Sequence, residues 1–239
     1  MALKALSSQV KGKQTVMNQQ SQHPAPGPRP PFSFPSPLYT IADTLGRPEL
    51  SLIEVAEKLC AGGAKILQLR AKDLPSRDFL EISHKVKAIC HRTGCVFIVN
   101  DRADIALAVE ADGVHVGQED LPLEAARKIL GPQKIIGVST HDPQQAQIAE
   151  RDGADYIGFG PMYGTTTKAT GYTARGREQL REIRAQVRLP IVAIGGITVE
   201  RAAATLTAGA DAVAMISELV LAQDTAAKVR ETLDHLRIG

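Results

Sequence analysis

The sequence predicts an α/β fold, a single-domain (β/α)8 TIM barrel that follows a disordered N-terminal extension. Three observations support this prediction. Eight short apolar runs recur along the chain, segments with apolar residues at three- and four-residue spacing separate them, and all eight units fit into residues 38–239. Continuously apolar strands that alternate with helices indicate a parallel sheet covered by helices. Eight such units in this length are typical of a barrel.

The expected elements follow one another regularly. The strands are LYTIA (38–42), KILQLR (65–70), CVFIV (95–99), GVHVG (113–117), KIIGVS (134–139), DYIGFG (155–160), PIVAIGG (190–196) and DAVAMIS (211–217). Amphipathic helices are expected between them, and several of these segments end in glycine, as helix C-termini often do. An open doubly wound sheet is the alternative, but such sheets usually have fewer strands.

The first 37 residues differ in composition from the rest. They hold seven of the fourteen prolines, four Lys or Arg and no Asp or Glu, without helical or strand periodicity. We therefore expect a disordered Pro-rich arm over residues 1–37 and the barrel domain over residues 38–239. The whole chain carries a formal charge of +2 and the arm +4, so the domain carries −2. This weakly acidic balance argues against a nucleic-acid partner.

Targeting signals and cysteine motifs add little. The N-terminus lacks an apolar segment typical of a signal peptide, and no run of about eighteen apolar residues follows. A cytoplasmic protein without a membrane partner is expected, and a faint likeness to a transit peptide is outweighed by the single arginine and many glutamines. The three cysteines form no C-x-x-C pair and are odd in number. The sequence thus signals neither a disulfide framework nor a zinc site.

Two carboxylates follow neighbouring predicted strands. Asp101 comes after CVFIV and Asp120 after GVHVG, with one helix-sized segment between them. A strand-helix-strand unit sets both at the same end of adjacent parallel strands. Paired carboxylates suit a hard cation that also carries phosphate oxygens, the usual way in which Mg2+ is held. The alternative is that both are turn residues or helix caps, as Asp120 before LPLEAARKIL could be.

Other polar residues cluster at the same predicted end of the barrel, where the chemistry of TIM barrels takes place. They are Gln68, Arg70 and Lys72 after the second strand, Asn100 after the third, Gln118 after the fourth, Ser139 and His141 after the fifth, Thr165, Thr166, Thr167 and Lys168 after the sixth, Gly195 and Gly196 after the seventh, and Ile216 and Ser217 after the eighth. Each alone is more typical of a loop. Together they predict a mouth that holds two phosphorylated groups.

At this level of detail the chain resembles the thiamine phosphate synthase (thiamine-phosphate pyrophosphorylase) family from Leu38 onward. The matching motifs are QLRAK (68–72), NDR (100–102), ADGVHVGQEDL (111–121), GVSTH (137–141), GPMYGTTTK (160–168), IGGI (194–197) and MIS (215–217). Two departures are Ala71, where many relatives have an acid, and Tyr163-Gly164, which replaces a proline-containing stretch. They bear on the shape of the loops.

The resemblance implies a Mg2+-dependent transferase that joins 4-amino-2-methyl-5-(diphosphooxymethyl)pyrimidine to a thiazole phosphate, either 4-methyl-5-(2-phosphooxyethyl)thiazole or its carboxylated form. It implies Asp101 and Asp120 as metal ligands and Arg70, Lys72, Lys168 and Ser139 as catalytic residues. The implied substrate contacts are these four together with Gln68, Leu69, Ala71, Asn100, Thr165, Thr166, Thr167, Gly196, Ile216 and Ser217. Small-molecule substrates are the expected partners.

The chemistry of this reaction agrees with the residue types. Breaking a C–O bond to diphosphate builds negative charge that Mg2+, Lys and Arg stabilise, and the thiazole nitrogen is itself the nucleophile, so a dissociative mechanism without a strong general base is expected. A histidine within a strand, such as His115, fills the barrel wall more often than it takes part in catalysis. Related thiazole tautomerases carry a functional histidine at the position of His141. A thiazole tautomerase of the same fold is therefore one alternative. A non-catalytic barrel that binds thiazole or thiamine phosphate is another.

Overall fold

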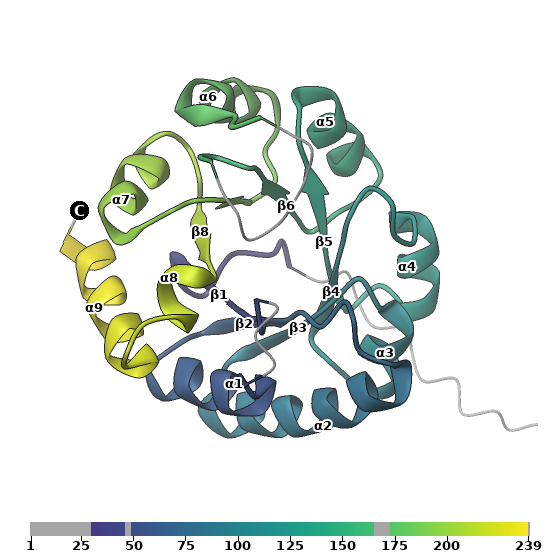
Figure 1. The fold of residues 1–239 in the computed structure, drawn as a ribbon. Coiled ribbons are helices and arrows are strands. Elements are labelled where there is room, and N and C mark those ends of the chain that lie inside the picture. The colour runs from purple at the N-terminus through teal and green to yellow at the C-terminus, as the bar shows by residue number, and fades with distance from the viewer. Residues whose placement is uncertain (1–29, 46–48, 165–172, 239) are drawn as a thin grey trace, which may run out of the picture.

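The computed structural model describes residues 30–45, 49–164 and 173–238. Eight parallel strands pair in chain order, and the last pairs with the first to close a barrel (Figure 1). The predicted TIM barrel is therefore confirmed. The strands are β1 (Leu38–Ala42), β2 (Ile66–Leu69), β3 (Val96–Asn100), β4 (Gly113–Val116), β5 (Ile135–Thr140), β6 (Tyr156–Phe159), β7 (Ile191–Ile194) and β8 (Ala212–Met215).

Helices surround the barrel on the outside (Figure 1). They are α1 (Leu52–Ala61), α2 (Ser76–Thr93), α3 (Ala103–Ala108), α4 (Leu123–Leu130), α5 (Pro143–Arg151), α6 (Gly176–Gln186), α7 (Val199–Thr207), α8 (Ser217–Val220) and α9 (Thr225–Ile238). Local sequence sets their ends: the side chain of Ser51 caps α1, Asp142 caps α5 before Pro143, and Gly94 ends α2 with a left-handed φ of 63°. Among the described residues, none of these helices combines the length and apolarity that crossing a bilayer requires.

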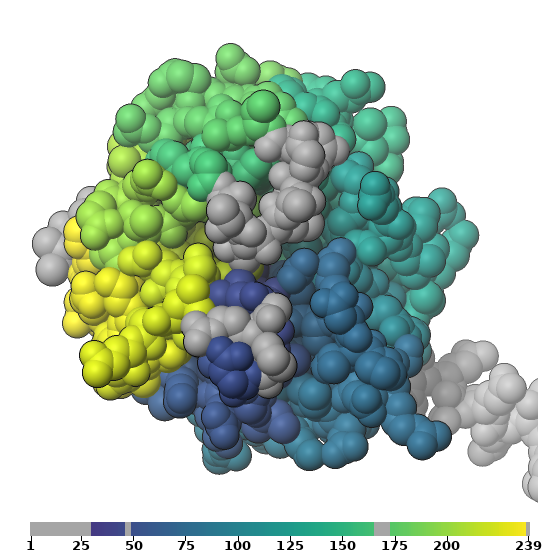
Figure 2. Space-filling view, viewed as in Figure 1, coloured from purple at the N-terminus to yellow at the C-terminus, as the bar shows by residue number. Residues whose placement is uncertain are grey.

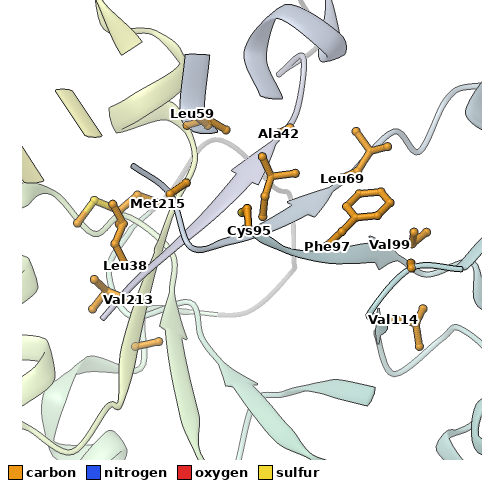
Figure 3. Close-up of a cluster of buried hydrophobic side chains, with 14 of the residues drawn as sticks. Leu38, Ala42, Leu59, Leu69, Cys95, Phe97, Val99, Val114, Val213 and Met215 are labelled. Carbon is orange, nitrogen blue, oxygen red and sulfur yellow. The ribbon is translucent and has the colours of Figure 1, made fainter. Parts of the chain in front are cut away.

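The barrel wall has two faces because successive strand residues point to opposite sides. Leu38 and Ala42 of β1 belong to a large apolar core between the strands and the helices, part of which is drawn in Figure 3. Tyr39 and Ile41 point the other way, into the barrel interior, where they join Ile66, Ile98, Tyr156, Val192, Ala212 and Ala214. The outer core is almost wholly apolar, whereas the interior also holds polar groups.

Residues 30–37 were assigned to the disordered arm, and the structure corrects this boundary. Phe32 and Phe34 pack on the inner cluster, with ring centroids 5.4 and 5.2 Å from that of Tyr156. The carbonyl of Pro37 accepts a hydrogen bond from Val213. The composition did not reveal this contact, because two phenylalanines among prolines show no periodicity. Residues 1–29, the rest of the predicted arm, lie outside the described residues.

Candidate active site at the mouth of the barrel

A cavity opens at the carboxyl ends of the strands, and this face of the molecule is hollowed at its centre (Figure 2). Every strand contributes to its lining. The lining residues are Tyr39, Ile41, Gln68, Arg70, Asn100, His115, Ser139, His141, Gly158, Gly160, Pro161, Val192, Ile194, Gly195, Gly196, Ile197, Ala214, Met215, Ile216 and Ser217. Seven residues predicted from the sequence as substrate contacts are among them: Gln68, Arg70, Asn100, Ser139, Gly196, Ile216 and Ser217.

Two glycines make room for aromatic side chains beneath the cavity. A Cβ atom on Gly137 of β5 would lie 2.1 Å from the ring of Tyr156, and one on Gly158 of β6 would lie 3.0 Å from the ring of His115. Any larger residue at position 137 would collide with the tyrosine. These glycines therefore allow Tyr156 and His115 to fill the barrel interior.

A chain of hydrogen bonds crosses the interior and ends at the cavity. The Gln68 amide Nε2 donates to the Tyr39 hydroxyl at 2.9 Å, and that hydroxyl lies 2.9 Å from the hydroxyl of Tyr156. The Tyr156 hydroxyl lies 3.0 Å from Nδ1 of His115, whose Nε2 lies 2.9 Å from Ser139 Oγ. Five strands thus contribute to one connected polar network within an apolar interior.

The donors in this chain have one order that uses every hydrogen. Tyr39 accepts from Gln68, so its own hydrogen goes to Tyr156, and that of Tyr156 goes to Nδ1 of His115. The neutral imidazole then donates from Nε2 to Ser139. Burial raises the pKa of both Tyr39 and Tyr156, which keeps these hydroxyls protonated. The hydrogen of Ser139 remains available for an acceptor in the cavity.

The two predicted metal ligands are neighbours. Burial raises the pKa of Asp101, and the adjacent carboxyl group of Asp120 raises it further, while Lys72 at 3.2 Å opposes this effect. The Gly117 amide donates to Asp120 at 2.7 Å and fixes its carboxylate. Asp101 has a φ of 64°, an uncommon conformation for a non-glycine residue. Its backbone amide donates to the backbone carbonyl of His115 at 2.7 Å.

This pair fits a hard divalent cation. Two partly buried carboxylates repel each other when both are ionised, and a cation between them removes that repulsion. Carboxylate oxygens are also the ligands that Mg2+ takes in proteins, usually one or two at a time beside phosphate oxygens. Lys72 contacts Asp101, and Arg70 lines the nearby cavity, so both are cations suited to the same phosphates.

The Arg70 guanidinium is held in place from below. It forms an ion pair with Asp43, which is buried just after β1. The Arg70 backbone amide donates to the backbone carbonyl of Ala42. Asn100 is buried at the end of β3, in register with His115 of β4. Asp43 did not stand out in the sequence, because a single acid after a strand is a common turn residue.

Two glycines shape the opposite wall of the cavity. Gly195 and Gly196 have φ values of 103° and 63°, which L side chains rarely adopt. A Cβ on Gly196 would lie 2.5 Å from the Gly164 carbonyl, and the Tyr163 amide donates to the Gly195 carbonyl at 2.9 Å. The end of β7 and the chain after β6 are therefore in close contact, with Ile216 and Ser217 beside them.

Some of the predicted site residues do not line the cavity. Leu69 is fully buried in the outer core, where Figure 3 labels it together with Phe97, and Ala71 packs against the same core. Neither side chain is among the cavity residues. The reason is strand alternation: Gln68 points inward, so Leu69 points outward. Thr165, Thr166, Thr167 and Lys168 lie outside the described residues.

Two histidines take defined positions. His115, expected only to fill the wall, links Tyr156 to Ser139. The Nδ1 atom of His141 lies 2.7 Å from the Gly160 carbonyl, so this nitrogen carries the hydrogen and donates it. Tyr39 and Tyr156 were missed as site residues. Their inward position follows from strand alternation, but the pairing of residues 117 positions apart does not.

Comparison with known proteins agrees with this geometry. The family model described as thiamine monophosphate synthase matches residues 38–219. A thiamine-phosphate synthase of Moorella thermoacetica is 50% identical over 81% of this chain and 92% of its own length, and one of Methanospirillum hungatei is 47% identical over 82% and 96%. The solved thiamine phosphate pyrophosphorylase of Pyrococcus furiosus superposes with a TM-score of 0.76 at 37% identity, covering 84% of this chain and 95% of that one. The chain belongs to the thiamine monophosphate synthase family.

Proposed function

We propose that this enzyme condenses 4-amino-2-methyl-5-(diphosphooxymethyl)pyrimidine with a thiazole phosphate, 4-methyl-5-(2-phosphooxyethyl)thiazole or its carboxylated form, at the mouth of the barrel. The products are thiamine phosphate and diphosphate. One observation carries the proposal. Asp101 and Asp120 form a carboxylate pair that Lys72 contacts, and these residues follow strands at the same end of the barrel as the cavity that Arg70 and Ser139 line.

The carboxylate pair and the cations divide the binding of diphosphate. Asp101 and Asp120 would hold Mg2+, which supplies positive charge to the phosphate oxygens when it is bound. Arg70 adds a fork of N–H donors that Asp43 holds in position, so little reorganisation is needed when charge develops on the leaving group. Lys72 pairs with Asp101 at 3.2 Å and would be able to bind the diphosphate oxygens when the two carboxylates hold Mg2+.

The floor of the cavity orients the pyrimidine ring. Ser139 is held as a donor by the chain from Gln68 through His115, so it offers its hydrogen to an acceptor nitrogen of the ring. Asn100 adds an amide at the same level of the wall. A ring fixed in this way presents its methylene carbon to the second substrate, which lowers the entropic part of the barrier.

The thiazole phosphate belongs on the opposite wall. Gly195 and Gly196 line that wall, where backbone amides can bind a phosphate, and Ser217 adds a hydroxyl. The C–O bond breaks heterolytically, its electron pair leaves with diphosphate, and the lone pair of the thiazole nitrogen forms the new C–N bond. No proton is removed from the nucleophile, so the dissociative mechanism needs no general base at this point.

The test is product formation from both substrates. The full-length enzyme with Mg2+ is expected to release diphosphate and thiamine phosphate in equal amounts, and to release little diphosphate when the thiazole phosphate is omitted. Isomerisation of a thiazole phosphate without release of diphosphate would instead establish the tautomerase alternative. Tight binding of thiamine phosphate with no turnover would establish the non-catalytic alternative.

A further inference from the structure

A cluster of three cysteines lies away from the mouth of the barrel. Cys60 is in the last turn of α1, Cys90 is in the last turn of α2, and Cys95 directly precedes β3. The ligand atoms of all three lie within 4.8 Å of one another, and all three residues are buried. Because they precede a strand or end a helix, they belong to the amino-terminal end of the barrel wall, opposite the cavity.

The local fold brings the sulfurs together. Gly94 ends α2 in a left-handed conformation, and the Cys95 amide then donates to the Cys90 carbonyl at 2.9 Å. This turn directs the chain back, so Cys95 joins Cys90 on the side that faces α1. Cys60 completes the group from α1, which packs along α2. Each of the three positions comes from a different element of the fold.

The cluster has the composition of a three-sulfur metal site. Within the described residues, no carboxylate or imidazole joins the three thiols as a fourth ligand of this group. Zinc in structural sites almost always takes four ligands, so this set is incomplete for zinc. Thiolate ligands select soft ions such as Cu(I), and Cu(I) accepts three sulfurs without a fourth ligand.

The surroundings also favour a cation. Two helices, α1 and α2, end at the cluster, and the C-terminal end of a helix carries a partial negative charge. Hydrogen bonds from Cys90 and Cys95 lower the pKa of Cys60, and the Arg92 guanidinium lowers it further. The same bonds and burial raise the pKa of Cys90 and Cys95.

We propose that Cys60, Cys90 and Cys95 form a binding site for a soft, three-coordinate ion, with Cu(I) as the ion that fits it. Binding forms three Cu–S bonds and releases to solvent the protons of those cysteines that are thiols, without any change of oxidation state. The site is separate from the carboxylate pair, whose hard oxygen ligands suit Mg2+. One chain would then hold two sites of opposite chemical preference.

Titration with Cu(I) tests this proposal. The reduced full-length enzyme is titrated anaerobically against a coloured Cu(I) chelator, and it is expected to withdraw one equivalent of Cu(I) per chain. X-ray absorption at the copper edge is expected to show a shell of three sulfurs with no nitrogen or oxygen. Bound Cu(I) is also expected to raise the thermal unfolding temperature, because it binds the folded state alone.

Matched variants separate ligation from packing. Cys60→Ala, Cys90→Ala and Cys95→Ala are each expected to lose the tight equivalent and the shift in unfolding temperature. Ile89→Val, which removes one methylene from a buried neighbour of Cys90 on α2, is expected to keep both. Circular dichroism and release of diphosphate check that each variant is folded.

Three results would overturn the proposal. The first is a wild-type enzyme that withdraws no Cu(I), and the second is a copper spectrum that contains nitrogen or oxygen ligands. The third is Zn2+ that binds the three cysteines as tightly as Cu(I) does. The first two measurements use only the wild-type chain, so they decide the question even if a cysteine variant fails to fold.

Discussion

The inner and outer faces of the barrel wall differ more than any other two regions of this molecule. On β2, Gln68 points inward to the hydrogen-bonded chain and the cavity, while Leu69 points outward into the apolar core. The outer face is filled mainly by apolar side chains that pack against the helices. The inner face combines polar groups, aromatic rings and glycines. Stability and chemistry are thus separated by one residue step along the same strand.

This separation has an energetic reason. Apolar side chains on the outer face are removed from water at a gain of roughly 25 cal/mol per Å2. Polar groups on the inner face gain little net energy even when each is hydrogen-bonded, at about 1 kcal/mol per bond. The inner face therefore depends on the outer face for stability. Substitutions on the two faces should produce different results.

The largest effect on stability is expected from Leu69→Ala. It removes a fully buried side chain from the outer core, so the free energy of unfolding should fall by about 2–5 kcal/mol. Leu67→Ala, on the same face of β2, is the matched control. It should lower the free energy of unfolding by a similar amount. Denaturant unfolding and kcat/KM measure the two effects. Loss of activity in folded Leu69→Ala but not in Leu67→Ala would instead assign Leu69 to substrate binding.

Gly137→Ala is the corresponding change on the inner face. Its new Cβ would lie 2.1 Å from the Tyr156 ring, so the free energy of unfolding should fall by about 1–3 kcal/mol and activity should fall with it, because the chain to Ser139 is displaced. In a Tyr156→Val background the ring that the methyl would meet is gone, so Gly137→Ala should cost little further stability, and activity should stay low. A stable and active Gly137→Ala enzyme would show that the inner wall is not tightly packed.

The aromatic contact from residues 30–37 gives a smaller effect. A chain that begins at residue 35 lacks Phe32 and Phe34, whereas one that begins at residue 30 keeps both rings against Tyr156. The shorter chain should lose about 1–3 kcal/mol of unfolding free energy relative to the longer one. Equal denaturation midpoints would show that the two phenylalanines contribute nothing to the barrel.

The smallest effect on stability is expected from removing one hydroxyl group. Tyr156→Phe breaks the chain between Tyr39 and His115, at a cost of about 1 kcal/mol, and kcat/KM for the pyrimidine should fall by about tenfold because Ser139 loses its fixed orientation. The side chain of Thr40 lies on the outer face of β1, and its buried hydroxyl donates to the Ile66 carbonyl. Thr40→Val removes this hydroxyl. It should cost similar stability and leave kcat/KM unchanged. Equal kcat/KM in both variants would contradict an orienting role for the chain.

Much of this architecture could be predicted from local sequence. The strand ends were placed within two residues because apolar runs and glycine punctuation are local signals. The positions of Gln68, Asn100 and Ser139 at the mouth followed from the rule that sites lie at the carboxyl ends of strands. The Leu69 side chain does not line the cavity, because strand geometry sends alternate side chains to opposite faces, whereas the motif was carried over as a continuous segment.

Other features depend on contacts between distant residues, which spacing does not encode. The tyrosine pair joins β1 to β6, and Asp43 reaches Arg70 from the preceding strand. The three cysteines looked unrelated because no two of them form a short metal motif, yet three elements bring them together. Phe32 and Phe34 lie in a Pro-rich stretch whose composition predicts disorder, and only the exposed end of the barrel interior gives them a place to pack.

Asp101 and Asp120 are expected to hold the cation that stabilises negative charge on the leaving diphosphate. The decisive measurement is the rate of diphosphate release as a function of Mg2+ concentration for Asp101→Asn, Asp120→Asn and the control Asp104→Asn, whose exposed carboxylate pairs with Arg102 on α3. The two site variants should need about tenfold more Mg2+, or a still higher concentration, for half-maximal rate while keeping the wild-type circular dichroism. The control should match the wild type. Full activity of both site variants at low Mg2+ would contradict the account.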